Sequence, residues 1–305
     1  MKEKIKQLRY RHVDVFSKTP LSGNGLTVFT NCEGLTTEAM QKITQEMRQF
    51  ESIFLFPTAE SHRFLARIFT MEEELDFAGH PILGAACVLH EQIKNEEQKG
   101  KWVLELRAKT VSTTTLKKEK SYLATMEQGE PYFELPLELQ KNSKLLRAFN
   151  LSEKDMHEIL PLQVVSTGLP YLIIPVQSSL ENVKIVTSEL GQMLAEIGAK
   201  FAYILQVSQL EGRTWDNDGR IEDIATGSAA GPVGAYLIRH GIKQPNMEII
   251  VHQGKFVGRP SQIFVKVTGT PNHMHSVEVS GEVYMIANGV FDSFEMSDTN
   301  FSINK

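Results

Sequence analysis

Glu51 stands where an ionisable side chain could do chemistry. It begins an otherwise apolar segment, residues 52–56. Burying a carboxylate without a partner is costly, so we expect a raised pKa for Glu51. A carboxyl group of this kind can exchange protons near neutral pH, as a general acid or base must. The alternative reading of Glu51, an exposed glutamate at the end of a strand, stays open.

His80 and Asp223 each lie at the start of a predicted helix. The positive end of a helix disfavours an imidazolium, so we expect a neutral His80 ring that can donate or accept a hydrogen bond. Asp223 could orient an imidazole or a substrate amine. The ordinary roles also stay open: a capping histidine, and an aspartate that only interacts with the helix dipole.

The sequences around His80 and Asp223 are two copies of one pattern, at residues 76–86 and 223–231. Each copy combines a strand end, a turn of small residues and a helix that is apolar on every face. The first backbone N–H groups of such a helix are free to bind an anion. Two such sites facing each other would hold one carboxylate. The candidate binding residues are Gly79, Gly227, Ser228 and Ala229.

The two helices, expected at residues 81–91 and 229–240, have no polar face until their ends, so each must be surrounded by other elements. Their small residues would let a sheet wrap closely around the helix axis. We therefore predict an α+β protein with two similar domains, each a mainly antiparallel sheet wrapped around a central apolar helix.

The order of predicted strands and helices also repeats, which places the two domains at residues 1–128 and 129–305. In the first domain, the charged stretch 94–101 indicates a solvated loop, followed by strands at 102–106 and 122–127. The tail, 287–305, is left open to pack back on the first domain.

The composition narrows the class of protein. The chain has 305 residues, 41% of them hydrophobic, and a net charge of −5. It has no basic stripe interleaved with aromatics, which excludes nucleic acid as a partner. Without a signal peptide or an apolar run of membrane length, we expect a cytoplasmic protein that forms a homodimer and does not bind membranes. Cys32 and Cys87 show no motif spacing and are expected to be buried thiols.

Several segments, in order along the chain, resemble one family. The matching residues are His12–Phe16, Leu21–Leu26, Val28–Phe29, Glu51, Ala78–Pro81, Leu83–Ala86, Glu222–Asp223, Thr226–Ala229, Gln253–Gly254 and Gly258–Ser261. Together they resemble the PhzF (phenazine biosynthesis-like) family, over almost the whole chain. That family has the diaminopimelate epimerase fold, in which the active site lies between the two domains.

This resemblance implies an isomerase that needs no metal or organic cofactor. The residue that matches Glu51 shuttles a proton between carbons of a cyclic dihydro-hydroxyanthranilate, and those matching His80 and Asp223 hold its amine or hydroxyl region. The substrate carboxylate would lie on the N–H groups at Gly79, His80, Gly227, Ser228 and Ala229. The chain departs from the family pattern at Gly25, Ile82 and Ile224, which leaves the substrate's shape open.

Two alternatives to this function stay open: a ligand-binding member of the same fold without activity, and a racemase or epimerase that does not use cysteines. Related racemases use two cysteines as acid and base, but the matching positions here hold Ala78 and Thr226. Neither residue exchanges a proton at physiological pH, so two-base racemisation is disfavoured.

Other motifs carry less weight. His273 and His275 lie on one face of an extended segment, but a zinc site needs a third ligand that the sequence does not provide. The glycines near Gly227 do not form a dinucleotide fingerprint. We therefore expect no metal and no nucleotide cofactor.

Overall fold

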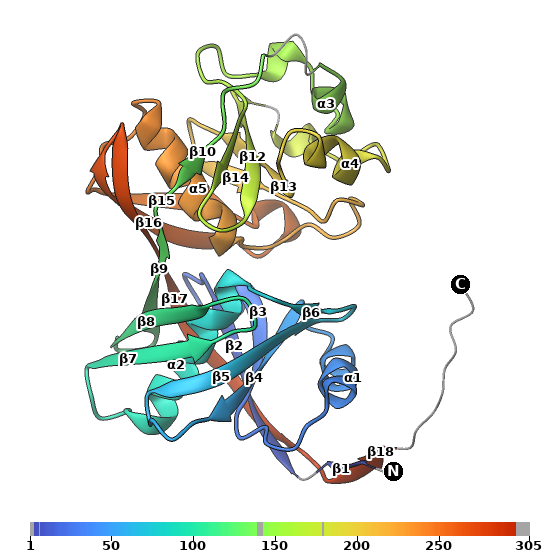
Figure 1. The fold of residues 1–305 in the computed structure, drawn as a ribbon, viewed down its shortest axis with the longest axis vertical. Helices are drawn as coiled ribbons and strands as arrows, with labels where there is room; N and C mark the ends of the chain where they lie inside the picture. The colour runs from blue at the N-terminus through green and yellow to red at the C-terminus, as the bar shows by residue number, and fades with distance from the viewer. Residues whose placement is uncertain (1–2, 6, 139–142, 179, 297–305) are drawn as a thin grey trace.

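The computed structural model describes residues 3–5, 7–138, 143–178 and 180–296 of the chain. Two lobes lie one above the other in Figure 1 and are connected by the long strand β17 (His273–Phe291). The first lobe contains strands β2 (Leu8–Val15), β3 (Asn24–Phe29), β4 (Glu51–Pro57), β5 (Arg63–Thr70), β6 (Glu74–Leu75), β7 (Lys99–Glu105), β8 (Thr110–Lys117) and β9 (Tyr122–Gly129), with helices α1 (Thr37–Met47) and α2 (Gly79–Ile93).

The second lobe contains a similar set of elements. Its strands are β10 (Tyr132–Phe133), β11 (Gln163–Ser166), β12 (Pro170–Val176), β13 (Phe201–Gln206), β14 (Glu211–Arg213), β15 (Glu248–Gln253) and β16 (Ser261–Thr270). Its helices are α3 (Ser143–Ala148), α4 (Leu190–Ala195) and α5 (Gly227–Arg239). Short 3₁₀ turns lie at Glu153–Asp155, Leu180–Asn182 and Lys255–Val257.

The two lobes repeat one strand pattern. In the first lobe β3, β4, β5, β7 and β8 pair in order, with parallel, antiparallel, parallel and antiparallel contacts. In the second lobe β12, β13, β14, β15 and β16 pair with the same alternation. Each central helix precedes the fourth strand of its series. The predicted fold of two similar α+β halves is confirmed.

Each central helix is enclosed by its sheet, as its lack of a polar face requires. Residues 79–90 of α2 are all buried, and the helix packs against strands of the first lobe and against β17. In α5 all residues but Ser228 and Arg239 are buried, and the helix packs against β11, β12, β15, β16 and β17. None of the helices in the described ranges is both long and apolar enough to span a membrane.

Both central helices begin two residues earlier than predicted, at Gly79 and Gly227, so the small-residue turns form the first helical turn itself. Pro232 lies inside α5, where the missing N–H leaves the Ser228 carbonyl without its intrahelical donor.

The predicted strands of the first lobe need two corrections. The predicted solvated loop 94–101 is wrong at its end, because β7 begins at Lys99, and the threonine-rich strand β8 was missed. Lys99 and Lys101 point outward while Gly100 and Trp102 are buried, so the charged residues occupy the exposed face of a strand.

The C-terminal segment forms the single long strand β17, which pairs with strands of both lobes. Residues 273–280 pair with β16 of the second lobe, residues 277–283 pair with β9, and residues 283–291 pair with β2. Strand β18 (Phe294–Met296) then pairs with β1 (Glu3–Ile5). Of the tail 287–305 considered above, residues 297–305 lie outside the described residues.

We predict that Gly234→Ala destabilises the protein while Gly191→Ala does not. A Cβ atom at Gly234 in α5 would lie 2.5 Å from Cγ1 and 3.3 Å from Cβ of the buried Val265, so the sheet must move away from the helix, at a cost of about 1–3 kcal/mol. At Gly191 in α4 a Cβ atom would meet Asn217 at 3.5 Å or more, and alanine favours the helix.

Thermal unfolding of the two variants measures the difference. An unchanged midpoint for Gly234→Ala would contradict the close contact between α5 and β16.

Candidate active site

The N-terminal ends of α2 and α5 meet at the junction of the lobes. A Cβ atom on Gly79 would lie 3.4 Å from the backbone nitrogen of Ser228 and 3.6 Å from the carbonyl carbon of Gly227. The N-cap residues are Ala78 and Thr226, and neither gives a side-chain cap to its helix. The first amides of both helices therefore lack the usual capping acceptor at one shared place.

One of the predicted binding residues behaves differently. The backbone N–H of Ala229 donates to the Thr226 carbonyl at 3.1 Å, so its hydrogen bond is already made within the first turn of α5. Gly227 and Ser228 precede it and, like Gly79 and His80, occupy helix positions without an intrahelical acceptor. The amides suited to an anion are thus those of the first two residues of each helix.

Glu51 and His80 lie together beside these helix ends. Glu51 is the first residue of β4, His80 is in the first turn of α2, and each side chain is about 5% exposed. Oε2 of Glu51 is 3.5 Å from Nδ1 of His80. The side-chain amide nitrogen of Asn24, the first residue of β3, is also 3.5 Å from Nδ1 of His80. The predicted proton carrier and the predicted histidine therefore adjoin each other.

Asn24 connects this pair to Asp223 in the other lobe. Its Nδ2 donates to Oδ1 of Asp223 at 2.9 Å and to the Ala225 carbonyl at 3.2 Å. Thr226 donates its hydroxyl to Oδ2 of Asp223 at 2.5 Å. The backbone N–H of Ala225 adds a longer contact of 3.4 Å to Oδ1. The structure thus brings Glu51, His80 and Asp223 into one cluster.

Burial sets the protonation states in this cluster. It raises the pKa of Glu51 well above its ordinary value, and the nearby Asp223 carboxyl raises it further. Burial lowers the pKa of His80 to about 3. The neutral histidine was expected, but from the helix end, whereas loss of solvent is the main cause. Burial also raises the pKa of Asp223, against the opposing hydrogen bonds from Thr226, Ala225 and Asn24.

These surroundings act differently on the two carboxyl groups. Asp223 accepts several donated hydrogen bonds, which favour its ionised form, and Glu51 has no such donors among the described residues beyond the 3.5 Å contact with His80. Glu51 therefore holds a proton more readily than Asp223, and Asn24 lies between the two carboxyl groups.

Three polar atoms of the cluster are buried without a hydrogen-bond partner among the described residues. They are Oε2 of Glu51, Nε2 of His80 and Oδ1 of Asn24. A buried polar atom left unpaired costs about 1–3 kcal/mol, so such atoms are rare unless a bound molecule satisfies them. If His80 accepts at Nδ1, its Nε2 carries the hydrogen and can donate to a ligand.

Residues that the sequence did not indicate as functional support the cluster. Gln253 donates to the Asp223 carbonyl at 2.8 Å and accepts from the backbone N–H of Thr226 at 3.1 Å. The hydroxyls of Tyr171 and Ser228 lie 2.8 Å apart. Asn24 and Gln253 belong to the segments that carry the family resemblance, which was the available indication; nothing marked Tyr171.

The other candidate groups lie elsewhere. Within the described ranges no set of three His, Cys, Asp or Glu side chains could hold a metal ion. The rings of His273 and His275 are 4.4 Å apart on β17 and both residues are exposed. Cys32 and Cys87 are buried free thiols, and burial raises the pKa of both. No thiol takes part in the cluster.

The comparisons with known proteins cover nearly the whole chain. Residues 13–289 match the family model for phenazine biosynthesis-like proteins. The chain belongs to this PhzF family. A trans-2,3-dihydro-3-hydroxyanthranilate isomerase of Pseudomonas chlororaphis is 31% identical, across 89% of this chain and 95% of that protein. Further curated relatives are also named isomerases, and this protein is an isomerase of the PhzF family.

Solved structures agree on the fold. A Pseudomonas aeruginosa protein described as a predicted epimerase is 44% identical, with a TM-score of 0.86 over 93% of this chain and 98% of that one. A hydroxyproline epimerase of Agrobacterium vitis shares the fold, with a TM-score of 0.65, 13% identity and coverage of 97% of this chain and 94% of that one.

We predict that Glu51→Gln becomes more stable relative to the parent protein as pH rises. The folded parent binds the Glu51 proton more tightly than the unfolded chain does. The stability from this tighter binding is complete below the ordinary pKa of 4.5 and is lost as pH rises through the folded pKa. Glutamine lacks this loss. Each unit of pKa difference corresponds to about 1.4 kcal/mol.

Urea unfolding of both proteins from about pH 5 to pH 8 measures the effect. A constant difference in the free energy of unfolding across this range would show that Glu51 has an ordinary pKa.

Proposed function

We propose that this PhzF-family isomerase, acting without a cofactor, relocates a proton within a small, cyclic, amino-acid-like substrate that bears a carboxylate. The observation that carries the proposal is the cluster of unpaired buried atoms on Glu51, His80 and Asn24 beside two uncapped helix ends. Polar atoms left unpaired in the protein's interior are suited to a polar ligand that completes their hydrogen bonds.

The substrate carboxylate binds at the paired helix ends. The donors are the backbone amides of Gly79, His80, Gly227 and Ser228. Each of the two helix dipoles adds partial positive charge there. One carboxylate between the ends would satisfy donors of both lobes at once. Ionised Asp223 faces the amine or hydroxyl of the ring, and the neutral Nε2–H of His80 donates to it.

Glu51 moves the proton. As a carboxylate it removes a proton from one ring carbon, the electron pair shifts through the adjacent double bond, and the protonated acid returns the proton to another carbon. Glu51 ends in the state in which it began, and no oxidant or reductant is needed. Its raised pKa suits both directions of transfer.

The related reaction of racemisation by two thiols is less suited to this chain. The helix N-cap positions, where the racemase relatives have cysteines, hold Ala78 and Thr226, and both cysteines lie away from the cluster. A ligand-binding protein without activity would use the helix ends but would have no use for a buried proton carrier at Glu51.

The direct test uses trans-2,3-dihydro-3-hydroxyanthranilate, the compound named for the Pseudomonas relatives, with a panel of other cyclic amino acids. Incubation in deuterated water, followed by NMR, should show deuterium at the carbon that gains the proton, because a carboxyl proton exchanges with solvent before delivery. Binding without turnover of every compound would favour the ligand-binding alternative. Inversion at one carbon without a double-bond shift would favour an epimerase.

We predict that Glu51→Gln lowers kcat by a factor of about 100 or more while substrate affinity stays within about threefold, because glutamine keeps the shape but cannot exchange the proton. The control is Glu91→Gln. Glu91 is at the opposite end of α2, about 16 Å along the helix from His80, and pairs with Arg11. It should keep full activity. Turnover by Glu51→Gln at the parent rate would rule out the proposed proton step.

Ser228→Ala is expected to weaken substrate binding as well as rate, in contrast to Glu51→Gln. Besides its amide, Ser228 has a hydroxyl that contacts Tyr171 at this helix end, and we expect this hydroxyl to donate a further hydrogen bond to the carboxylate. Loss of one hydrogen bond to a charged group corresponds to about 1.5–3 kcal/mol, a rise in Kd of roughly 10- to 150-fold. Isothermal titration with a product or inhibitor checks this, and an unchanged Kd would show that the Ser228 hydroxyl does not contact the carboxylate.

A further inference from the structure

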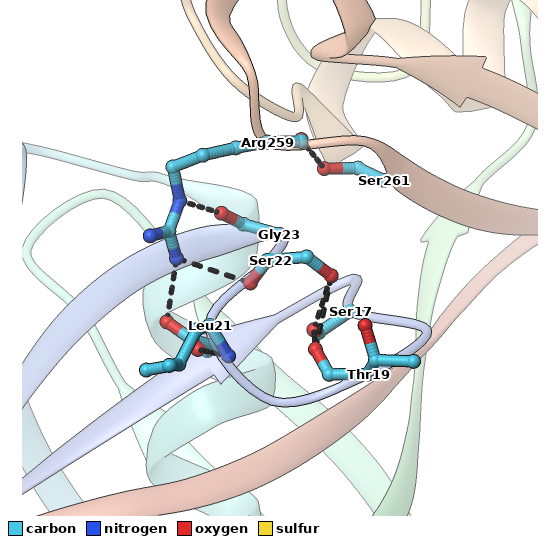
Figure 2. A network of polar contacts seen from close by, with 8 residues as sticks. Ser17, Thr19, Leu21, Ser22, Gly23, Arg259 and Ser261 are labelled. Atoms are coloured by element: carbon cyan, nitrogen blue, oxygen red, sulfur yellow. Dashed lines mark hydrogen bonds and ion pairs between the residues drawn. The ribbon is translucent and has the colours of Figure 1, made fainter.

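Arg259 joins the two lobes beside the candidate active site. It lies in the second lobe, just after the 3₁₀ turn Lys255–Val257, and Figure 2 shows its side chain reaching a turn of the first lobe. Its Nε donates to the Gly23 carbonyl at 2.6 Å. Its Nη2 donates to Oδ1 of Asp14 at 2.7 Å and to the Ser22 carbonyl at 3.1 Å. The planar guanidinium therefore fixes this turn from several directions.

The turn that Arg259 holds is conformationally demanding. Phe16 and Leu21 have positive φ angles of 59° and 65°, which non-glycine residues rarely adopt, and Gly23 has a φ of 69°. Asp14 is 1% exposed, and its second oxygen accepts the backbone N–H of Leu21 at 2.8 Å. The turn ends at Gly23, and the next residue is Asn24. Arg259 thus fixes the carbonyl directly before the residue whose amide connects His80 to Asp223.

The segment of the second lobe that ends at Arg259 also contacts Asp223, through Gln253 at its start. Gln253 donates to the Asp223 carbonyl and to the Thr226 hydroxyl, at 2.8 and 3.0 Å. Between Gln253 and Arg259 the chain closes on itself, because the Arg259 N–H donates to the Gly254 carbonyl at 3.0 Å. Residues 253–259 therefore contact both Asp223, through Gln253, and the residue before Asn24, through Arg259.

We propose that Arg259 is a positioning residue that sets the Asn24 amide against Asp223, and so fixes the Glu51–His80 pair of one lobe relative to the Asp223 carboxyl of the other. Arg259 touches none of the atoms in the cluster itself. The pair with Asp14 adds little stability because Arg259 is partly exposed. Its effect on turnover rests on the proposed function, whereas its effect on the Asn24–Asp223 contact does not.

The experiment follows the titration of the Asp223 carboxyl and of the His12 imidazole by NMR in ¹³C-labelled protein. Burial and Arg259 both lower the pKa of His12, and Asp14 raises it. Arg259→Gln should therefore raise the pKa of His12 through loss of charge alone, which verifies the substitution. The pKa of Asp223 should rise only if the Asn24 donor moves away. The matched control, Arg11→Gln, removes a guanidinium that pairs with Glu91 within the first lobe and should leave Asp223 unchanged.

A double-variant comparison shows whether Arg259 acts through Asn24. Asn24→Ala should raise the pKa of Asp223 directly, and adding Arg259→Gln to it should raise this pKa no further. With an active substrate, Arg259→Gln should lower kcat by about 10- to 100-fold and change KM little, because misplacement by about 1 Å costs this much. Arg259→Lys keeps the charge but lacks the planar guanidinium with its separate donors, and should restore only part of the rate.

An unchanged pKa of Asp223 in Arg259→Gln, or equal additional shifts in the double variant, would overturn the proposal. If Arg259→Gln does not fold, Asp14→Asn removes the ion pair instead; the pKa of His12 should then fall, and the pKa of Asp223 is read as before. If no substrate is turned over, the proposed function fails while the Asp223 titrations still decide whether Arg259 positions Asn24.

Discussion

Two helix ends of like polarity meet inside this protein, and the rest of the structure holds them there. The N-termini of α2 and α5 each carry partial positive charge, which disfavours their contact at Gly79 and Ser228. Each helix is enclosed by a sheet and cannot move without loss of its packing. A bound anion would relieve the repulsion. The two sheets therefore hold the helix ends in an electrostatically unfavourable arrangement, which a negatively charged group would stabilise.

The same enclosure also sets the protonation states of the buried side chains at these helix ends. Loss of solvent holds Glu51 towards its protonated form and His80 towards its neutral form. The duplication does not extend to this tuning. Glu51 begins β4, and the matching first residue of β13 in the second lobe is Phe201. One lobe supplies Glu51 and His80, and the other supplies Asp223, so a fold with two similar halves carries an asymmetrical candidate site.

The sequence was most informative where a property is local. Helices without a polar face predicted both central helices, and a carboxyl group in an apolar strand predicted the pKa direction of Glu51. Contacts between distant segments were not predictable in this way. Asn24 meets Asp223 only after the lobes associate, and Tyr171 reaches Ser228 from another strand. Strand β8 was missed because alternating threonines carry less hydrophobic contrast than the valine- and phenylalanine-rich strands, and the cause of the neutral His80 depends on burial, which only the fold defines.

Strand β17 separates the order of the chain from the division into lobes. It enters from the second lobe, lies between β9 and β2, and ends at the far edge of the first lobe. The first lobe therefore receives its last strand only when residues 273–291 have been made. During synthesis, residues 8–129 would leave the ribosome with the inner edges of β2 and β9 unpaired. The two halves look like independent units, but both depend on β17. The second lobe must therefore be complete before the sheet of the first lobe can be.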